Sequence, residues 1–79
     1  MKHFIEFFNS DNEVVKVYKT SYSSLRKAMV RLYDLSLQHK GLFRRYIRVR
    51  REDGLIYHIK LFDNGVYAVS NETGKVYQY

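Results

Sequence analysis

The chain contains no cysteine, and this absence excludes two kinds of architecture. Without cysteine it has no disulfide framework and no thiolate metal site. It also lacks any apolar run long enough for a transmembrane helix, and its N-terminus lacks the layout of a signal peptide. Internal repeats and low-complexity segments are missing as well. We therefore expect a cytoplasmic protein that does not associate with a membrane.

Residue groupings that usually carry catalysis or metal binding are also lacking. The three histidines, His3, His39 and His58, are scattered without an H-x-x-x-H or H-x-E spacing, so we expect packed or exposed side chains rather than metal ligands. Most carboxylates fall in predicted turns, where turn formation explains them better than acid–base catalysis does. Ser23 and Ser24 have no obvious histidine base. The sequence predicts a protein that is not an enzyme and holds no cofactor.

Aromatic, apolar and positively charged residues are plentiful instead. The 79 residues are 46% hydrophobic, with eight tyrosines and five phenylalanines, which supports a domain near the size where a single core is marginal. Residues 26–51 hold nine Lys/Arg and one acid, whereas the rest holds five Lys/Arg and seven acids. A one-sided basic surface favours a polyanionic partner, either nucleic acid or an acidic protein, although excess charge can also serve solubility alone.

One helix is predicted from Ser21 to Gly41. Ser21 can act as the N-cap, with Thr20 or Ser23 as alternatives, and Gly41 is a natural residue for a positive φ just past the helix end. Apolar residues recur at spacings of three and four along this segment, which is the pattern of an amphipathic helix. The predicted buried stripe consists of Leu25, Ala28, Met29, Leu32, Leu35 and Ser36.

Alternating apolar residues and turn signals predict five or six strands in the rest of the chain. The expected strands span Lys2–Phe8, Glu13–Lys19, Leu42–Arg51, Leu55–Phe62, Val66–Ser70 and, if the end does not fray, Lys75–Tyr79. The order is ββαβββ or ββαββββ. It predicts one α+β domain over residues 1–79, with a single helix packed on one face of an antiparallel sheet. In the first strand, Phe4, Glu6 and Phe8 share one face and His3, Ile5 and Phe7 share the other.

Because one helix covers only one sheet face, the opposite face is expected to display a basic and aromatic set of side chains. This set consists of Arg44, Tyr46, Arg48 and Arg50 beside Ile56, His58, Lys60 and Phe62. Arginine matches phosphate or carboxylate oxygens, and the rings can stack on bases or on partner side chains. The alternative is that these arginine and tyrosine side chains only pack against one another across the strands and have no binding role.

A second basic set lies on the expected outer face of the helix and consists of Arg26, Lys27 and Arg31. It can follow a phosphate backbone or an acidic groove. The alternative is an ordinary solvated helix face, in which Asp34 pairs with Arg31 or Lys27.

Three short segments carry a likeness to a known family. They are Ser24-Leu25-Arg26-Lys27-Ala28 at the helix opening, Gly54-Leu55 at a turn exit and Asp63-Asn64-Gly65 in a turn, and they span about the last two-thirds of the chain. With this layout the chain resembles the small phage-encoded anti-CRISPR proteins of the ββαβββ type, which obstruct type I surveillance complexes. The resemblance implies a non-catalytic inhibitor in the host cytoplasm. It would press basic and aromatic side chains against the surface that a CRISPR effector uses for DNA, or against DNA itself.

Three functional hypotheses follow. The first is a non-enzymatic inhibitor or adaptor that binds an acidic protein surface or a nucleic-acid-handling complex such as a CRISPR effector. The second is a stand-alone DNA- or RNA-binding domain that uses the same Arg/Tyr face and whose affinity falls steeply with salt. The third is a homodimer with tyrosine and phenylalanine in a shared sheet face; otherwise the chain is a monomer. The choice between the two basic sets stays open at this point.

Overall fold

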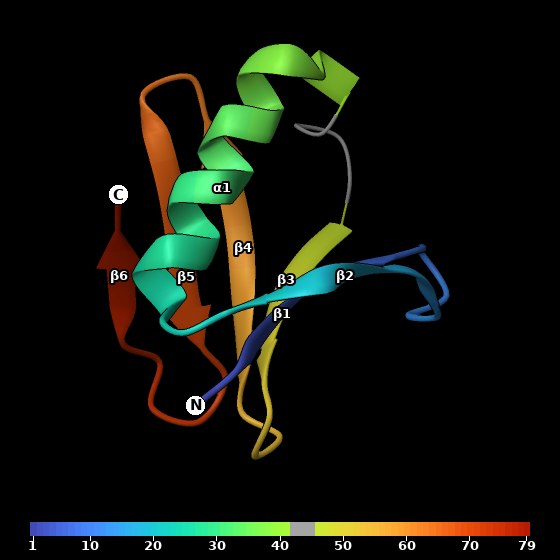
Figure 1. Cartoon of the computed structure of the whole chain (residues 1–79), viewed down its shortest axis with the longest axis vertical. Coiled ribbons are helices and arrows are strands. Elements are labelled where there is room, and N and C mark those ends of the chain that lie inside the picture. The colour runs from blue at the N-terminus through green and yellow to red at the C-terminus, as the bar shows by residue number, and fades with distance from the viewer. Residues whose placement is uncertain (42–45) are drawn as a thin grey trace.

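The computed structural model describes residues 1–41 and 46–79, in which one helix packs on an antiparallel sheet of six strands (Figure 1). The sheet order is β2-β1-β3-β4-β5-β6, so β2 and β6 form its edges. The elements are β1 (His3–Phe8), β2 (Val14–Tyr22), α1 (Leu25–Gln38), β3 (Tyr46–Arg51), β4 (Ile56–Phe62), β5 (Gly65–Ser70) and β6 (Val76–Gln78). The predicted α+β class and the longer predicted order, ββαββββ, are confirmed. The first residues of the predicted third strand, 42–45, lie outside the described residues.

The helix begins later than the sequence pattern predicted. Ser24 is the N-cap, and its Oγ accepts a hydrogen bond from the backbone N–H of Lys27 at 3.2 Å. The prediction of Ser21 as the cap was wrong because β2 continues to Tyr22 and Ser21 still pairs with Phe4 of β1. At the other end the helix stops at Gln38, and Gly41 does not adopt a positive φ. In the described part of the chain, no helix has the length and apolar character needed to cross a membrane.

The core lies between α1 and the face of the sheet that the helix covers. The predicted helix stripe is confirmed at Ala28, Met29, Leu32, Leu35 and Ser36, which are all buried. Alternation along the strands supplies the other side of the core. The buried strand residues of the core are Ile5, Phe7, Ile47, Val49, Tyr57, Ile59, Val66 and Ala68. The residues between them on each strand point away from the helix.

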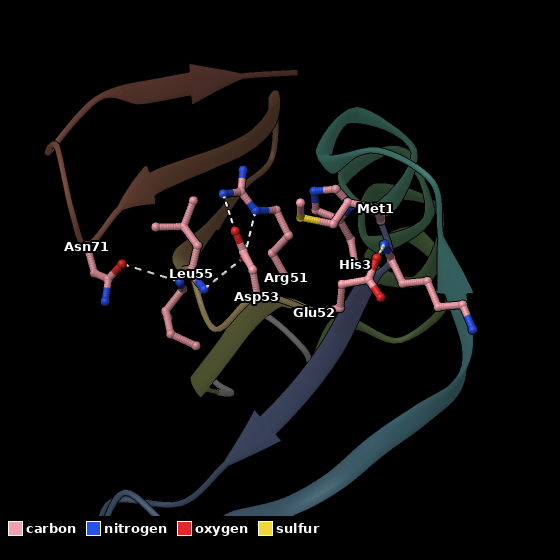
Figure 2. Close-up of polar contacts among 9 residues, drawn as sticks. Met1, His3, Arg51, Glu52, Asp53, Leu55 and Asn71 are labelled. Atoms are coloured by element: carbon pink, nitrogen blue, oxygen red, sulfur yellow. Dashed lines mark hydrogen bonds and ion pairs between the residues drawn. The ribbon is translucent and has the colours of Figure 1, made fainter.

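Polar contacts stabilise the turn between β3 and β4, which lies next to the N-terminus (Figure 2). Arg51 donates two hydrogen bonds to Asp53, Nε to Oδ1 at 2.8 Å and Nη2 to Oδ2 at 2.6 Å. These bonds from Arg51 lower the pKa of Asp53 to about 2. Gly54 follows with a φ of 98°, as a tight turn requires. The backbone N–H of Lys2 donates to Oε1 of Glu52 at 2.7 Å, which ties the start of the chain to this turn.

The third hairpin turn depends on a glycine for a different reason. Gly65 pairs with Phe62, and a Cβ added to Gly65 would overlap the backbone carbonyl oxygen of Tyr79. That oxygen accepts a hydrogen bond from the backbone N–H of Val66 at 2.9 Å, so it cannot easily move away. The close approach holds the last strand against β5.

We expect Gly65→Ala to lower the free energy of unfolding by about 2 kcal/mol, because the new methyl group overpacks this junction. Urea denaturation followed by circular dichroism would measure the change. Gly41→Ala is the matched control, since a Cβ there meets nothing within 4 Å and the backbone is not left-handed. Equal stability of the two variants would contradict the close-packing explanation.

Candidate binding face of the sheet

The sheet face opposite α1 gathers side chains from all six strands. Cross-strand register brings Val17, Glu6 and Arg48 into one row, and the same row continues through His58, Val69 and Val76. We call this surface the open face. It consists of Phe4, Glu6, Phe8, Val14, Val17, Tyr46, Arg48, Arg50, Ile56, His58, Lys60, Phe62, Tyr67, Val69 and Val76.

A buried carboxylate lies at the centre of the β1–β3 half of the open face. The Glu6 side chain is only 6% exposed, and its two oxygens accept hydrogen bonds from Nε of Arg48 and Nε of Arg50, both at 2.9 Å. Burial raises the pKa of Glu6, but the hydrogen bonds and charges of Arg50 and Arg48 outweigh burial and hold this pKa below its usual value. The carboxylate is therefore ionised at neutral pH and orients both guanidinium groups.

The same two arginines also pack on aromatic rings of β1. The Arg48 guanidinium lies 5.4 Å from the centroid of the Phe8 ring, and the Arg50 guanidinium lies 4.9 Å from that of Phe4. A cation over a ring face gains electrostatic attraction, and the ring is covered at the same time. Both phenylalanines are accordingly half-buried, although they lie on the sheet face opposite α1.

Other aromatic residues on the open face stay exposed. Tyr46 stacks on Phe8 with ring centroids 5.5 Å apart and is 53% exposed. Phe62 meets Tyr67 edge to face at 5.2 Å and is 48% exposed. Phe62 and Tyr67 also border a shallow hollow of about 460 Å³ over β4–β6, whose remaining walls are Lys60, Asn64, Val69 and Val76. Exposed rings beside a hollow of this kind are typical of binding surfaces.

The structure brings most of the predicted sheet residues together. Tyr46, Arg48, Arg50, His58, Lys60 and Phe62 all lie on the open face, with Ile56 beside them. Arg44, the remaining member of the predicted set, lies outside the described residues. Alternation along β3 and β4 was enough to place these side chains.

The predicted helix set lies on the other side of the molecule. Arg26, Lys27 and Arg31 are exposed on α1, and the Arg26 guanidinium lies 5.5 Å from the centroid of the Tyr79 ring. Asp34 forms no ion pair with Lys27 or Arg31 within the described residues. The helix and the open face point in opposite directions, so the two basic sets form separate surfaces. One flat partner surface cannot contact both sets.

Sequence reasoning missed the role of Glu6 and its two phenylalanine neighbours. The alternation of β1 correctly placed Phe4, Glu6 and Phe8 on one face, but it did not show which strand lies beside them. The neighbour is β3, which is distant in the chain and places Arg48 directly opposite Glu6. A lone acid in a strand otherwise rich in phenylalanine was the available signal, since buried acids need positive partners.

The histidines occupy packed or exposed positions, as expected. His3 is buried on the helix side, where Nδ1 lies 3.0 Å from the carbonyl oxygen of Met1 and 3.3 Å from that of Tyr22 (Figure 2). Since both neighbours are acceptors, Nδ1 carries the hydrogen. His39 and His58 are exposed. Across residues 1–41 and 46–79, no group of three or more His, Cys, Asp or Glu side chains is placed to hold a metal ion.

Comparisons with protein-family models, with curated proteins and with solved structures found no significant match to this chain. The open face is therefore the main indication of function.

We expect Glu6→Gln to lower the free energy of unfolding at pH 7 by about 2 kcal/mol, because it removes the charge that both arginines share. Urea denaturation would measure this loss. Glu13→Gln is the matched control, since Glu13 is exposed and uses its backbone N–H, not its carboxylate, in the turn. An unchanged stability of Glu6→Gln would show that the arginines can turn to water without cost.

Stability should also depend on pH through Glu6. Its folded-state pKa lies below the ordinary 4.5, so its contribution is complete above that pH and is lost as the pH falls through the folded-state value. We expect the difference in stability between wild type and Glu6→Gln to shrink steadily from pH 5 downwards. Denaturation curves at several pH values would test this, and parallel pH profiles for the two proteins would contradict it.

Proposed function

We propose that this protein is a non-enzymatic binding protein that docks its open face on an acidic surface of a partner protein. One observation supports this most directly. Arg48 and Arg50, which Glu6 holds in place, lie on the same surface as the exposed rings of Tyr46 and Phe62. Tyrosine and arginine dominate the energetics of protein interfaces, and a rigid surface loses little entropy on binding. Hydrophobic residues around them supply the area that excludes water.

The charge of the open face favours a protein over nucleic acid or a second copy of the chain. Among the described residues of the open face, Arg48, Arg50 and Lys60 contribute three positive charges and Glu6 one negative charge, which leaves +2 when histidine is counted as neutral. Nucleic-acid interfaces are much more positive, whereas most side chains here are apolar. Two copies meeting face to face would bring like charges together at the centre of the interface. An acidic partner surface with apolar pockets fits both features.

The resemblance to anti-CRISPR proteins supports a nucleic-acid-handling complex, such as a CRISPR effector, as the class of partner. A channel that binds DNA is itself positively charged, so it would repel Arg48, Arg50 and Lys60. The charge of the open face therefore favours an acidic patch elsewhere on such a complex. Inhibition would follow from blocking a subunit contact or a movement there.

We expect the double variant Lys60→Glu/Phe62→Ser to abolish binding to purified nucleic-acid-targeting complexes while leaving the fold intact, since both side chains are exposed. The matched control is Lys27→Glu/Arg31→Glu, which alters two exposed residues on α1 instead. A pull-down with cross-linking would measure binding. Loss of binding with the α1 variant alone would overturn the proposal. Arg48→Glu is unsuitable as a probe because it would place a carboxylate against buried Glu6.

The exposed rings of Tyr46 and Phe62 also suit stacking by bases, so direct nucleic-acid binding is the second candidate. Fluorescence anisotropy with labelled single- and double-stranded oligonucleotides, at low and physiological salt, separates the two. Tight binding that falls steeply with salt and is lost in Lys60→Glu would replace the protein partner with nucleic acid. Sedimentation at high concentration tests the homodimer, which a monomeric result would exclude.

A further inference from the structure

We infer that Arg48 and Arg50 form a two-arginine site for carboxylate side chains of the partner protein, an inference that rests on the proposed function. Each arginine uses its Nε to bind one oxygen of Glu6. A guanidinium has further N–H donors on its two Nη atoms, and in the described residues these donors have no hydrogen-bond partner. One carboxylate also cannot balance two guanidinium charges, so the cluster retains a net positive charge.

The Nη atoms are open to solvent. Among the described residues, no buried side-chain nitrogen or oxygen lacks a hydrogen-bond partner, so the unpaired Nη atoms must be accessible. The exposed fractions of the two side chains, 20% for Arg48 and 37% for Arg50, agree with this. The donors are therefore not sealed inside the protein, and an incoming oxyanion can reach them at the open face.

Arg51, the next residue of the same strand, differs because its charge is balanced by a carboxylate of its own. Its Nε and Nη2 both bind the carboxylate of Asp53, which occupies the fork completely on one edge. Arg48 and Arg50 instead share a single carboxylate between them, so each donates only one hydrogen bond to it and the charge of the pair is only half balanced. Within the described part of the chain, one arginine of β3 therefore has its own carboxylate and two others, at alternate positions, share one.

The guanidinium groups of Arg48 and Arg50 are held in a fixed orientation before any ligand binds. Glu6 holds each guanidinium by one hydrogen bond, and Phe8 and Phe4 support the flat sides of Arg48 and Arg50. Arginines on alternate residues of a strand lie roughly 7 Å apart, which suits one bridging carboxylate or two adjacent ones. Since little rotamer freedom remains to be lost, binding is more favourable than at an exposed arginine without such supports, such as Arg31 on α1.

Carboxylate is the oxyanion that fits this surface best. The surrounding open face is mostly apolar and includes exposed Tyr46, which is typical of protein contacts. A phosphate chain would need cations spread along its path, whereas the described cations of the open face gather at Arg48, Arg50 and Lys60. We therefore commit to aspartate or glutamate side chains presented by a protein, with phosphate as a competing outcome of the test.

Arginine Nε–H signals in ¹H–¹⁵N NMR spectra test the site directly. The labelled protein is titrated with a hexaglutamate peptide, with inorganic phosphate and with a thymidine oligonucleotide. We expect hexaglutamate to shift the Nε–H signals of Arg48 and Arg50 and to leave that of Arg51 unchanged. Arg48→Lys and Arg50→Lys should each weaken hexaglutamate binding roughly fivefold, since lysine retains the charge but not the planar fork.

Arg31→Lys is the matched control and should bind hexaglutamate like wild type, and urea denaturation verifies that all variants fold. The inference is wrong if the Lys variants bind as well as wild type, because the site would then be only a positive potential. A response to phosphate or oligonucleotide without one to hexaglutamate would also overturn it. The proposed function is judged separately by Lys60→Glu/Phe62→Ser. If that variant loses the partner and the Arg→Lys variants do not, only the two-arginine site fails.

Discussion

A carboxylate buried on a sheet face without a helix needs positive partners, and this need governs the open face. Glu6 lies in the middle of β1, where desolvation would be costly if it were alone. Both of its partners come from β3, and Arg48 sits directly opposite it in the register. A slip of one residue between β1 and β3 would send the arginines to the helix side and leave Glu6 unpaired. The ion cluster therefore ties strand register to the chemistry of the surface.

The same cluster divides the open face into two halves. Over β1 and β3, the arginine side chains cover Phe4 and Phe8, so apolar surface is hidden beneath charge. Over β4–β6, none of the described arginines lies over the Phe62 ring, which is 48% exposed beside the hollow. A chain of 79 residues with a single described helix cannot bury both faces of a six-stranded sheet. The first half covers its apolar surface with its own arginine side chains, whereas the second half leaves the Phe62 ring exposed.

Much of this organisation follows from local sequence pattern. The period of two in β3 and β4 placed Tyr46, Arg48, His58 and Lys60 correctly, and the period near 3.6 gave the buried stripe of α1. What local pattern could not supply was the neighbour of β1, because β3 is brought beside it by the fold and not by a hairpin. For that reason the sequence pattern did not predict that Arg48 and Arg50 bind Glu6. The prediction of Ser21 as the helix N-cap was wrong because Ser21 pairs with Phe4 and belongs to β2. Strand pairing with β1 extends β2 further than its own sequence indicates, and this pairing overrides the capping preference of serine.

The two basic sets have different physical roles if the open face makes the contact. Arg26, Lys27 and Arg31 point away from a partner bound there, so they cannot form short-range bonds with it. Their charge still adds to the potential around a small molecule of net charge +6, and at physiological ionic strength such potentials act over roughly 8 Å. In a protein only 30 × 27 × 24 Å in extent, most of that effect is screened before it reaches the opposite face. If the open face binds an acidic surface, the electrostatic part of the affinity would then come from its own cations, and the helix set would mainly contribute to solubility.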